Sequence, residues 1–174
     1  MLKQTRKNKA PAWELTEIVI QKGKNLSKKY NANTNLVLIA LYLAHIKFSK
    51  KVGGKIQKNH EKLSARLAGK YLRKWGVDEK KIEIILNSIR SHHDKEKGKS
   101  IEAEVMKNAE CYKFLTIIGA LALLHNMGER GESFRKSMKY VIKKMKQKER
   151  LLTIPECKFE AKKNIKEIES IFQL

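Results

Sequence analysis

The stretch LVLIALYLAHIKF, residues 36–48, is the most apolar part of the chain and decides its fold. Its residues are apolar around the whole circumference of a helix, a pattern typical of a helix buried in a protein core. Thr34 precedes the stretch and is a residue type that caps helices. Because residues 36–46 are too few to cross a bilayer, we expect a central helix of a globular domain and no membrane span.

Outward from this stretch, the remaining segments also read as helices. The chain is rich in Lys, Glu, Leu and Ile and has only two prolines, and no segment alternates as a strand would. We therefore predict an all-α fold, a compact single-domain bundle of about six to seven helices over residues 11–174. Residues 1–10 read as a flexible basic arm. The other helices are expected from Pro11 to Asn31, from a cap at Asn59 to Gly76, from a cap at Asp78 to His93, from Ser100 to about His125, over 132–150 and over 155–174. In the helix over 132–150, one face is expected to be buried: Phe134, Met138, Val141 and Met145.

The charge is the strongest compositional signal. Thirty-nine Lys and Arg residues face eighteen Asp and Glu residues, a formal net charge of +21. Such a surface attracts polyanions, so RNA, a nucleotide or a larger ribonucleoprotein complex are the expected partners; the alternative is that the charge reflects the host's composition. Aromatic residues make up only 7%, which favours contacts to phosphates over base stacking. The candidate anion-binding residues form one stripe at helical spacing: Arg135, Lys139, Lys143, Lys146 and Arg150.

The cysteines and the N-terminal residues bear on the compartment. Cys111 and Cys157 fit no metal or redox spacing, and reduced thiols are the default in the cytosol. The polar, basic start of the chain does not resemble a signal peptide. We expect a cytoplasmic protein.

Four of the five histidines lie at places where helices could bring them together. His45 lies within the apolar stretch, His60 begins a predicted helix, and His92 and His93 end another. Imidazoles on facing helices can converge on a metal ion. The alternative for each one is a hydrogen-bonded core histidine or a cation at a helix C-terminus.

The order of these segments resembles the HD superfamily of metal-dependent phosphohydrolases. LVLIALYLAHI (36–46) resembles the helix that carries the family's His-Asp pair, and NHEKLSARLA (59–68) resembles its His-Glu-x-x-Ser/Ala helix. KIEIILNSIRSHH (81–93) resembles the helix that ends in Ile-x-x-His, and SIEAEVMKNAE (100–110) the segment that ends in Ala-Asp. IIGALALLHNMGERG (117–131) resembles the family's continuation, and the C-terminal part resembles a small nucleotide-hydrolysing branch.

The resemblance implies a changed set of metal ligands. The first family histidine falls on Leu15, and the Ala-Asp carboxylate falls on Glu110. The His-Asp pair falls on Ala44 and His45 or, with a shift of one residue, on His45 and Ile46, and both alignments lose the aspartate. With the family's usual ligands lost, no cofactor is expected by default; the residues that remain able to hold a divalent ion (Mn, Zn, Fe or Mg) are His45, His60, His92 and Glu110, with His93 as an accessory residue.

Two hypotheses for the activity follow from this changed set. Because Leu15 and Ala44 cannot bind metal, we expect a domain that has lost catalysis and binds RNA, a nucleotide or another polyanion through its basic surface. The alternative is an active metal-dependent phosphohydrolase with a rebuilt, histidine-rich site, which would act on a nucleotide or a phosphoester.

Overall fold

The structure, a computed structural model, describes residues 13–47, 59–93 and 97–172, and these residues form α-helices and no strand. The predicted all-α fold is confirmed, with one helix more than expected within this part of the chain. The basic arm expected at 1–10 lies outside the described residues. The helices are α2 (Trp13–Lys29), α3 (Thr34–Leu43), α4 (His60–Lys74), α5 (Glu79–Ser91), α6 (Ile101–Tyr112), α7 (Ile117–Gly128), α8 (Phe134–Glu149) and α9 (Pro155–Phe172).

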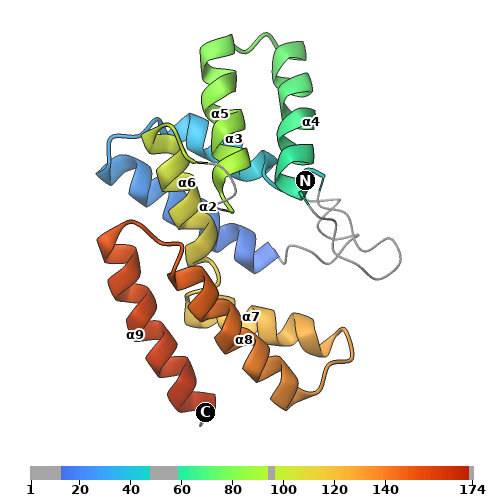
Figure 1. The fold of residues 1–174 in the computed structure, drawn as a ribbon, viewed down its shortest axis with the longest axis vertical. Helices are drawn as coiled ribbons and strands as arrows, with labels where there is room; N and C mark the ends of the chain where they lie inside the picture. The colour runs from blue at the N-terminus through green and yellow to red at the C-terminus, as the bar shows by residue number, and fades with distance from the viewer. Residues whose placement is uncertain (1–12, 48–58, 94–96, 173–174) are drawn as a thin grey trace.

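The helices form three groups along the long axis of the molecule (Figure 1). The antiparallel pair α4 and α5 lies at one end, α2, α3 and α6 lie in the middle, and α7, α8 and α9 lie at the other end. Helix α3 packs against α2, α4, α5 and α6, and its Val37, Ala40 and Leu41 are almost fully buried. The apolar stretch therefore supplies the central helix, as its composition predicts, but this helix ends at Leu43 and residues 44–47 form a turn; Phe48 lies outside the described residues.

The helix starts show which polar side chains act as caps. Asp78 and Ser100 cap α5 and α6 as expected, each accepting a hydrogen bond from a backbone N–H of the first turn. Thr34 was wrongly expected to cap α3: it is already helical, and Asn33 is the cap because its Oδ1 accepts from Leu36 N at 3.2 Å. Asn59 precedes α4 but has a left-handed backbone (φ 64°), so its side chain makes no capping hydrogen bond.

The single long helix expected from Ser100 to His125 is wrong, because the chain bends by 60° between α6 and α7. Thr116 starts α7 by accepting a hydrogen bond from Gly119 N at 2.9 Å, which gives the second helix its own N-terminus. Among the described residues, no single helix passes the length and hydropathy test for a membrane span; α6 and α7 pass it only as this bent pair.

Helices α8 and α9 follow the predicted ranges to within two residues. Val141 and Met145 are buried, whereas Phe134, expected on the same buried face, is 66% exposed because it is the first residue of α8, where that face leaves the core. The apolar face of α9 is buried as predicted, including Ile165 and Ile168.

Candidate metal centre

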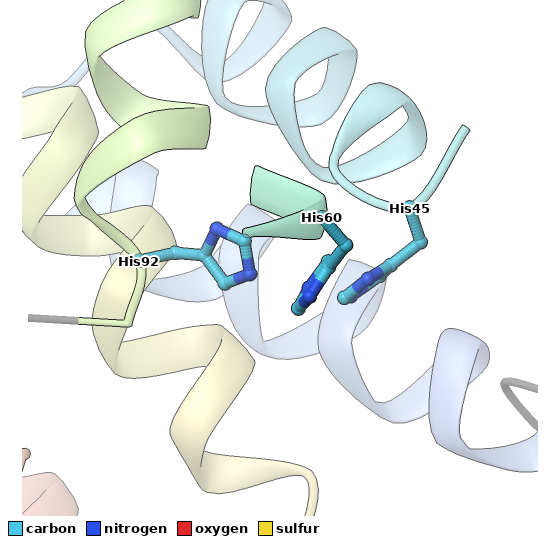
Figure 2. Close-up of side chains that lie close together, drawn as sticks. All are labelled: His45, His60 and His92. Carbon is cyan, nitrogen blue, oxygen red and sulfur yellow. The ribbon is translucent and has the colours of Figure 1, made fainter. Parts of the chain in front are cut away.

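Helix ends bring three histidines together (Figure 2). His45 lies just after α3, His60 is the first residue of α4, and His92 is the C-cap of α5. One ring nitrogen from each lies within 4.8 Å of those from the other two, and the ring centroids are 5.4–5.7 Å apart. We call these residues the histidine cluster. Three nitrogen donors at this spacing can face one common point.

His92 has the geometry of a pre-oriented metal ligand. Its ring is fully buried, and its Nδ1–H donates a hydrogen bond to the Ile89 carbonyl oxygen at 2.6 Å. This bond fixes the tautomer and leaves the lone pair on Nε2, which has no hydrogen-bond partner among the described residues. Burial lowers the pKa of His92 to about 3, so the imidazole is neutral and able to ligate at ordinary pH.

Glu110 brings a carboxylate to the cluster from the end of α6. Its Oε2 lies 3.3 Å from His45 Nε2 and accepts a hydrogen bond from Lys113 Nζ at 2.6 Å. Its Oε1 is buried without a hydrogen-bond partner in the described part of the chain. Burial alone would raise the pKa of Glu110, but the charges of Lys113 and His45 outweigh it and hold that pKa well below its usual value. The group is therefore an ionised oxygen donor.

His93 lies between His60 and Lys148 of α8. The Nε2 atoms of His60 and His93 lie 3.2 Å apart, a hydrogen bond in which only one of the two nitrogens carries the proton. Burial and the neighbouring His45 lower the pKa of His60 to about 4, and burial and His92 lower the pKa of His93 below its usual value. Lys148 Nζ lies 3.3 Å from His93 Nδ1. His93 therefore links the cluster to α8.

The structure brings together the four side chains that the sequence singled out as metal ligands, and places His93 beside them. It leaves His125 outside: that side chain lies on α7 and is 75% exposed. Leu15 and Ala44 are buried apolar residues. That any of these residues binds a metal stays a prediction.

Sequence reasoning missed three charged residues of the site: Glu61, Lys113 and Lys148. All are buried, and Glu61 Oε2 lies 3.5 Å from His60 Nδ1. Two of them carried a signal that periodicity could have found. Lys113 follows Glu110 by three residues and so shares its helical face, and Lys148 continues the buried stripe of Val141 and Met145.

The stripe of basic residues on α8 is exposed, as its spacing predicts. Part of it lines a groove between α8 and α9 with a volume of about 750 Å³, which we call the basic groove. Lys146 forms an ion pair there with Glu169 at 2.6 Å. Its lining residues are Lys139, Ile142, Lys143, Lys146, Gln147, Arg150 and Glu169. Anion binding by this stripe stays a prediction.

The donor set fits a borderline divalent ion. Neutral imidazoles and a carboxylate suit Zn²⁺ or Fe²⁺, whereas Mg²⁺ prefers a shell of oxygen atoms. His92 Nε2 and Glu110 Oε1, two buried atoms that have no hydrogen-bond partner among the described residues, are both of ligating type. Lys113 competes for Glu110, so only part of that carboxylate's capacity is available to an ion.

Comparison with known proteins gives one family and two similar structures. The model of the HD domain matches residues 16–115, more than half of the chain. An HD-superfamily hydrolase from Bacillus thuringiensis superposes with a TM-score of 0.67 at 16% identity, covering 94% of this chain and 83% of that one. A protein from Lactobacillus plantarum superposes with a TM-score of 0.66 at 16% identity, covering 91% and 82%.

These two structural similarities establish the fold. No curated protein matches the sequence. The matched residues 16–115 include the histidine cluster and Glu110, which occupy the segments that resemble the family's motifs. The chain belongs to the HD-domain family.

Proposed function

We propose that the chain binds one divalent metal ion through His45, His60, His92 and Glu110 and hydrolyses a phosphate ester or phosphoanhydride there. The observation that carries this proposal is the convergence of the three histidines, whose ring nitrogens lie within 4.8 Å of one another. His92 Nε2 supports it further, because this buried ring nitrogen has no hydrogen-bond partner among the described residues, whereas buried polar atoms usually have one.

The chemistry follows from what the residues offer. A bound divalent ion would polarise a phosphoryl oxygen and lower the pKa of a water molecule. His92 is held for ligation by the Ile89 carbonyl, and Glu110 supplies negative charge to the same point. The ammonium group of Lys113 is positioned to attract an anionic substrate towards the cluster.

The residues that replace the family's usual ligands support a change of ion. Leu15 and Ala44 are buried and carry no donor atom, so the site depends on imidazoles. We therefore propose zinc or ferrous iron in preference to magnesium.

Metal binding is tested first, because it can fail independently of catalysis. The purified protein should hold one transition-metal ion per chain, and the metal-free protein should bind Zn²⁺ far more tightly than Mg²⁺ in a calorimetric titration. His92→Gln should lose most of this affinity. His125→Gln removes an exposed histidine outside the site and should change nothing. A wild-type protein that folds and binds no divalent ion would refute the metal centre.

Hydrolysis is tested with the metal-loaded protein. Phosphate release from nucleoside mono-, di- and triphosphates should depend on the ion and disappear in His92→Gln but not in His125→Gln. Stoichiometric metal without any release from these substrates would leave a metal-binding domain and refute the enzyme.

A second function, binding of RNA or another polyanion, is supported by a different observation. The basic groove gathers four positive side chains and one carboxylate on an exposed face of α8 and α9. Contacts to phosphates carry no sequence information, so binding should weaken steeply with salt and depend little on sequence.

Two triple variants with the same change of charge separate the groove from the overall charge. The variant Lys139→Glu, Lys143→Glu and Arg150→Glu reverses the groove. The control Lys62→Glu, Lys70→Glu and Lys80→Glu reverses exposed residues of α4 and α5. Filter binding of single-stranded RNA should be weakened more by the first variant than by the second. Equal losses would mean that net charge alone attracts RNA.

A further inference from the structure

Three lysines from two helices surround one aromatic ring next to the histidine cluster. Lys113 follows α6, and Lys144 and Lys148 lie on α8. Their Nζ atoms lie 5.2, 5.5 and 5.8 Å from the centroid of the Phe114 ring. We call them the lysine trio. Three ammonium groups around one ring concentrate positive charge in a small volume.

The trio is unusually buried for lysine. Lys113 is 4% exposed and Lys148 is 3% exposed, while Lys144 is partly exposed. Lysine is almost never fully buried unless an anion or a polar network compensates it. Glu110 compensates Lys113 at 2.6 Å. Burial lowers the pKa of Lys144 to about 8, and the charges of Lys148 and Lys113 act in the same direction.

The trio contacts the histidine cluster directly at one point and through His93 at a second. Lys113 Nζ lies 3.5 Å from His45 Nε2, and Lys148 Nζ lies 3.3 Å from His93 Nδ1, which in turn contacts His60. An anion held by the trio would thus lie beside the point that the three histidines face. The basic groove is a separate feature, because neither Lys113 nor Lys148 lines it.

We propose that Lys113, Lys144 and Lys148 bind a terminal phosphate group, and so select substrates that end in a phosphate over those whose phosphates are all internal diesters. The burial of two of the three lysines supports this choice, since an internal phosphate carries a substituent on both sides and enters a buried site less easily. A terminal phosphate also carries close to two negative charges near neutral pH, against one for a diester. The selection among substrates rests on the proposed hydrolase; the binding of the phosphate does not.

The experiment is a calorimetric titration of the metal-free protein with four compounds. Inorganic phosphate and adenosine 5′-monophosphate both present a terminal phosphate, the dinucleoside monophosphate ApA has only a diester, and adenosine has none. We expect the first two to bind, ApA to bind at least about tenfold more weakly than the monophosphate, and adenosine not to bind. A higher affinity for the monophosphate than for inorganic phosphate would show that the ligand is an ester and not the free ion.

Two variants link the binding to the trio. Lys144→Gln should raise the dissociation constant for phosphate about tenfold or more, because it removes one charged donor. The side chain is partly exposed, so folding should survive. Lys148→Met keeps the length and apolar stem of the buried side chain and should act in the same direction. Lys70→Gln changes an exposed lysine of α4 that belongs to neither the trio nor the basic groove; it is the matched control and should leave the constant unchanged.

The outcomes separate this proposal from the metal centre. If the protein binds phosphate but no metal ion, the phosphate site at the lysine trio is supported and the hydrolase is refuted. If it binds a metal ion but no phosphate, only the phosphate site at the lysine trio is refuted. The trio is also refuted if Lys144→Gln binds phosphate as the wild type does, or if ApA binds as tightly as the monophosphate.

Discussion

At the scale of single residues, the protonation of His92 makes the free energy of unfolding depend on pH. Its imidazole is neutral in the folded protein because burial lowers its pKa from 6.5 to about 3. In the unfolded chain it takes up a proton near pH 6.5, so the unfolded state binds more protons as the pH falls between these values. The stabilising contribution is complete above pH 6.5 and is lost as the pH falls towards 3.

Urea unfolding of the metal-free protein at several pH values tests this coupling. The free energy of unfolding should fall by up to about 1.4 kcal/mol per pH unit on account of His92. His92→Gln should lose this part of the slope and retain the rest, which includes His60 and Glu110. His125→Gln should keep the wild-type slope. Identical slopes in wild type and His92→Gln would show that His92 does not stay neutral in the folded state.

The sequence predicted the donor residues of the site better than their surroundings. His45, His60 and His92 are recognisable because they lie in an apolar helix or at the ends of predicted helices, whereas Glu110 is recognisable only because residues 100–110 resemble the HD family's Ala-Asp segment. Lys113 and Lys148 are missed because lysine is common in this chain, and the residue type alone does not distinguish a buried lysine from an exposed one. Only their register on α6 and α8 distinguishes them.

At the scale of elements, the turn between α6 and α7 determines where Lys113 lies. An added Cβ on Gly119 would overlap the backbone carbonyl oxygen of Lys113, so the turn requires glycine at this position. The sequence did not reveal the break, because no proline or glycine lies between Tyr112 and Ile117. Thr116, a single capping residue, is the only local signal for a new helix.

Two glycine substitutions in α7 test this role of the turn. Gly119→Ala should lower the free energy of unfolding by about 2 kcal/mol or more, because the backbone of the turn has to shift. It should also weaken phosphate binding by displacing Lys113. Gly128→Ala adds the same methyl group where nothing lies within 4 Å, and should be neutral or stabilise by up to about 1 kcal/mol. Equal effects in thermal or urea unfolding would contradict the close approach.

A second element-scale contact attaches the start of α9 to α6. Asn108 is fully buried; its Oδ1 accepts hydrogen bonds from the backbone N–H groups of Thr153 and Ile154, both at 3.0 Å, and its Nδ2 donates to Thr153 Oγ1 at 2.7 Å. Asn108→Ala should therefore cost about 2–4 kcal/mol, since it leaves buried N–H groups unsatisfied. Asn126→Ala removes only a bond within α7 to Ala122 and should cost much less in urea unfolding.

At the scale of the whole molecule, a formal charge of +21 on 174 residues must oppose compaction. Most of the described ion pairs, such as that of Lys146 with Glu169, lie at the surface, where they offset little of the repulsion between the positive charges. Few of the described ion pairs lie in the interior. The fold tolerates this charge because its core is continuous from α2 to α9. The buried positive charge is concentrated at one place, where the lysine trio meets the histidine cluster.

Salt should therefore stabilise this protein by two separable routes. Sodium chloride screens the mutual repulsion of the surface lysines, so the melting temperature should rise from low ionic strength to about 0.1 M, where the Debye length is about 10 Å. Sodium phosphate at equal ionic strength should raise it further, because an anion that binds the folded state at the trio adds its binding free energy to stability. Lys144→Gln should abolish most of the difference between the two salts and leave the effect of chloride intact.

The variant with Lys62, Lys70 and Lys80 changed to Glu should do the opposite, reducing the effect of chloride and keeping the additional effect of phosphate. A melting temperature that does not respond to chloride would show that the surface charges are already compensated in the folded protein.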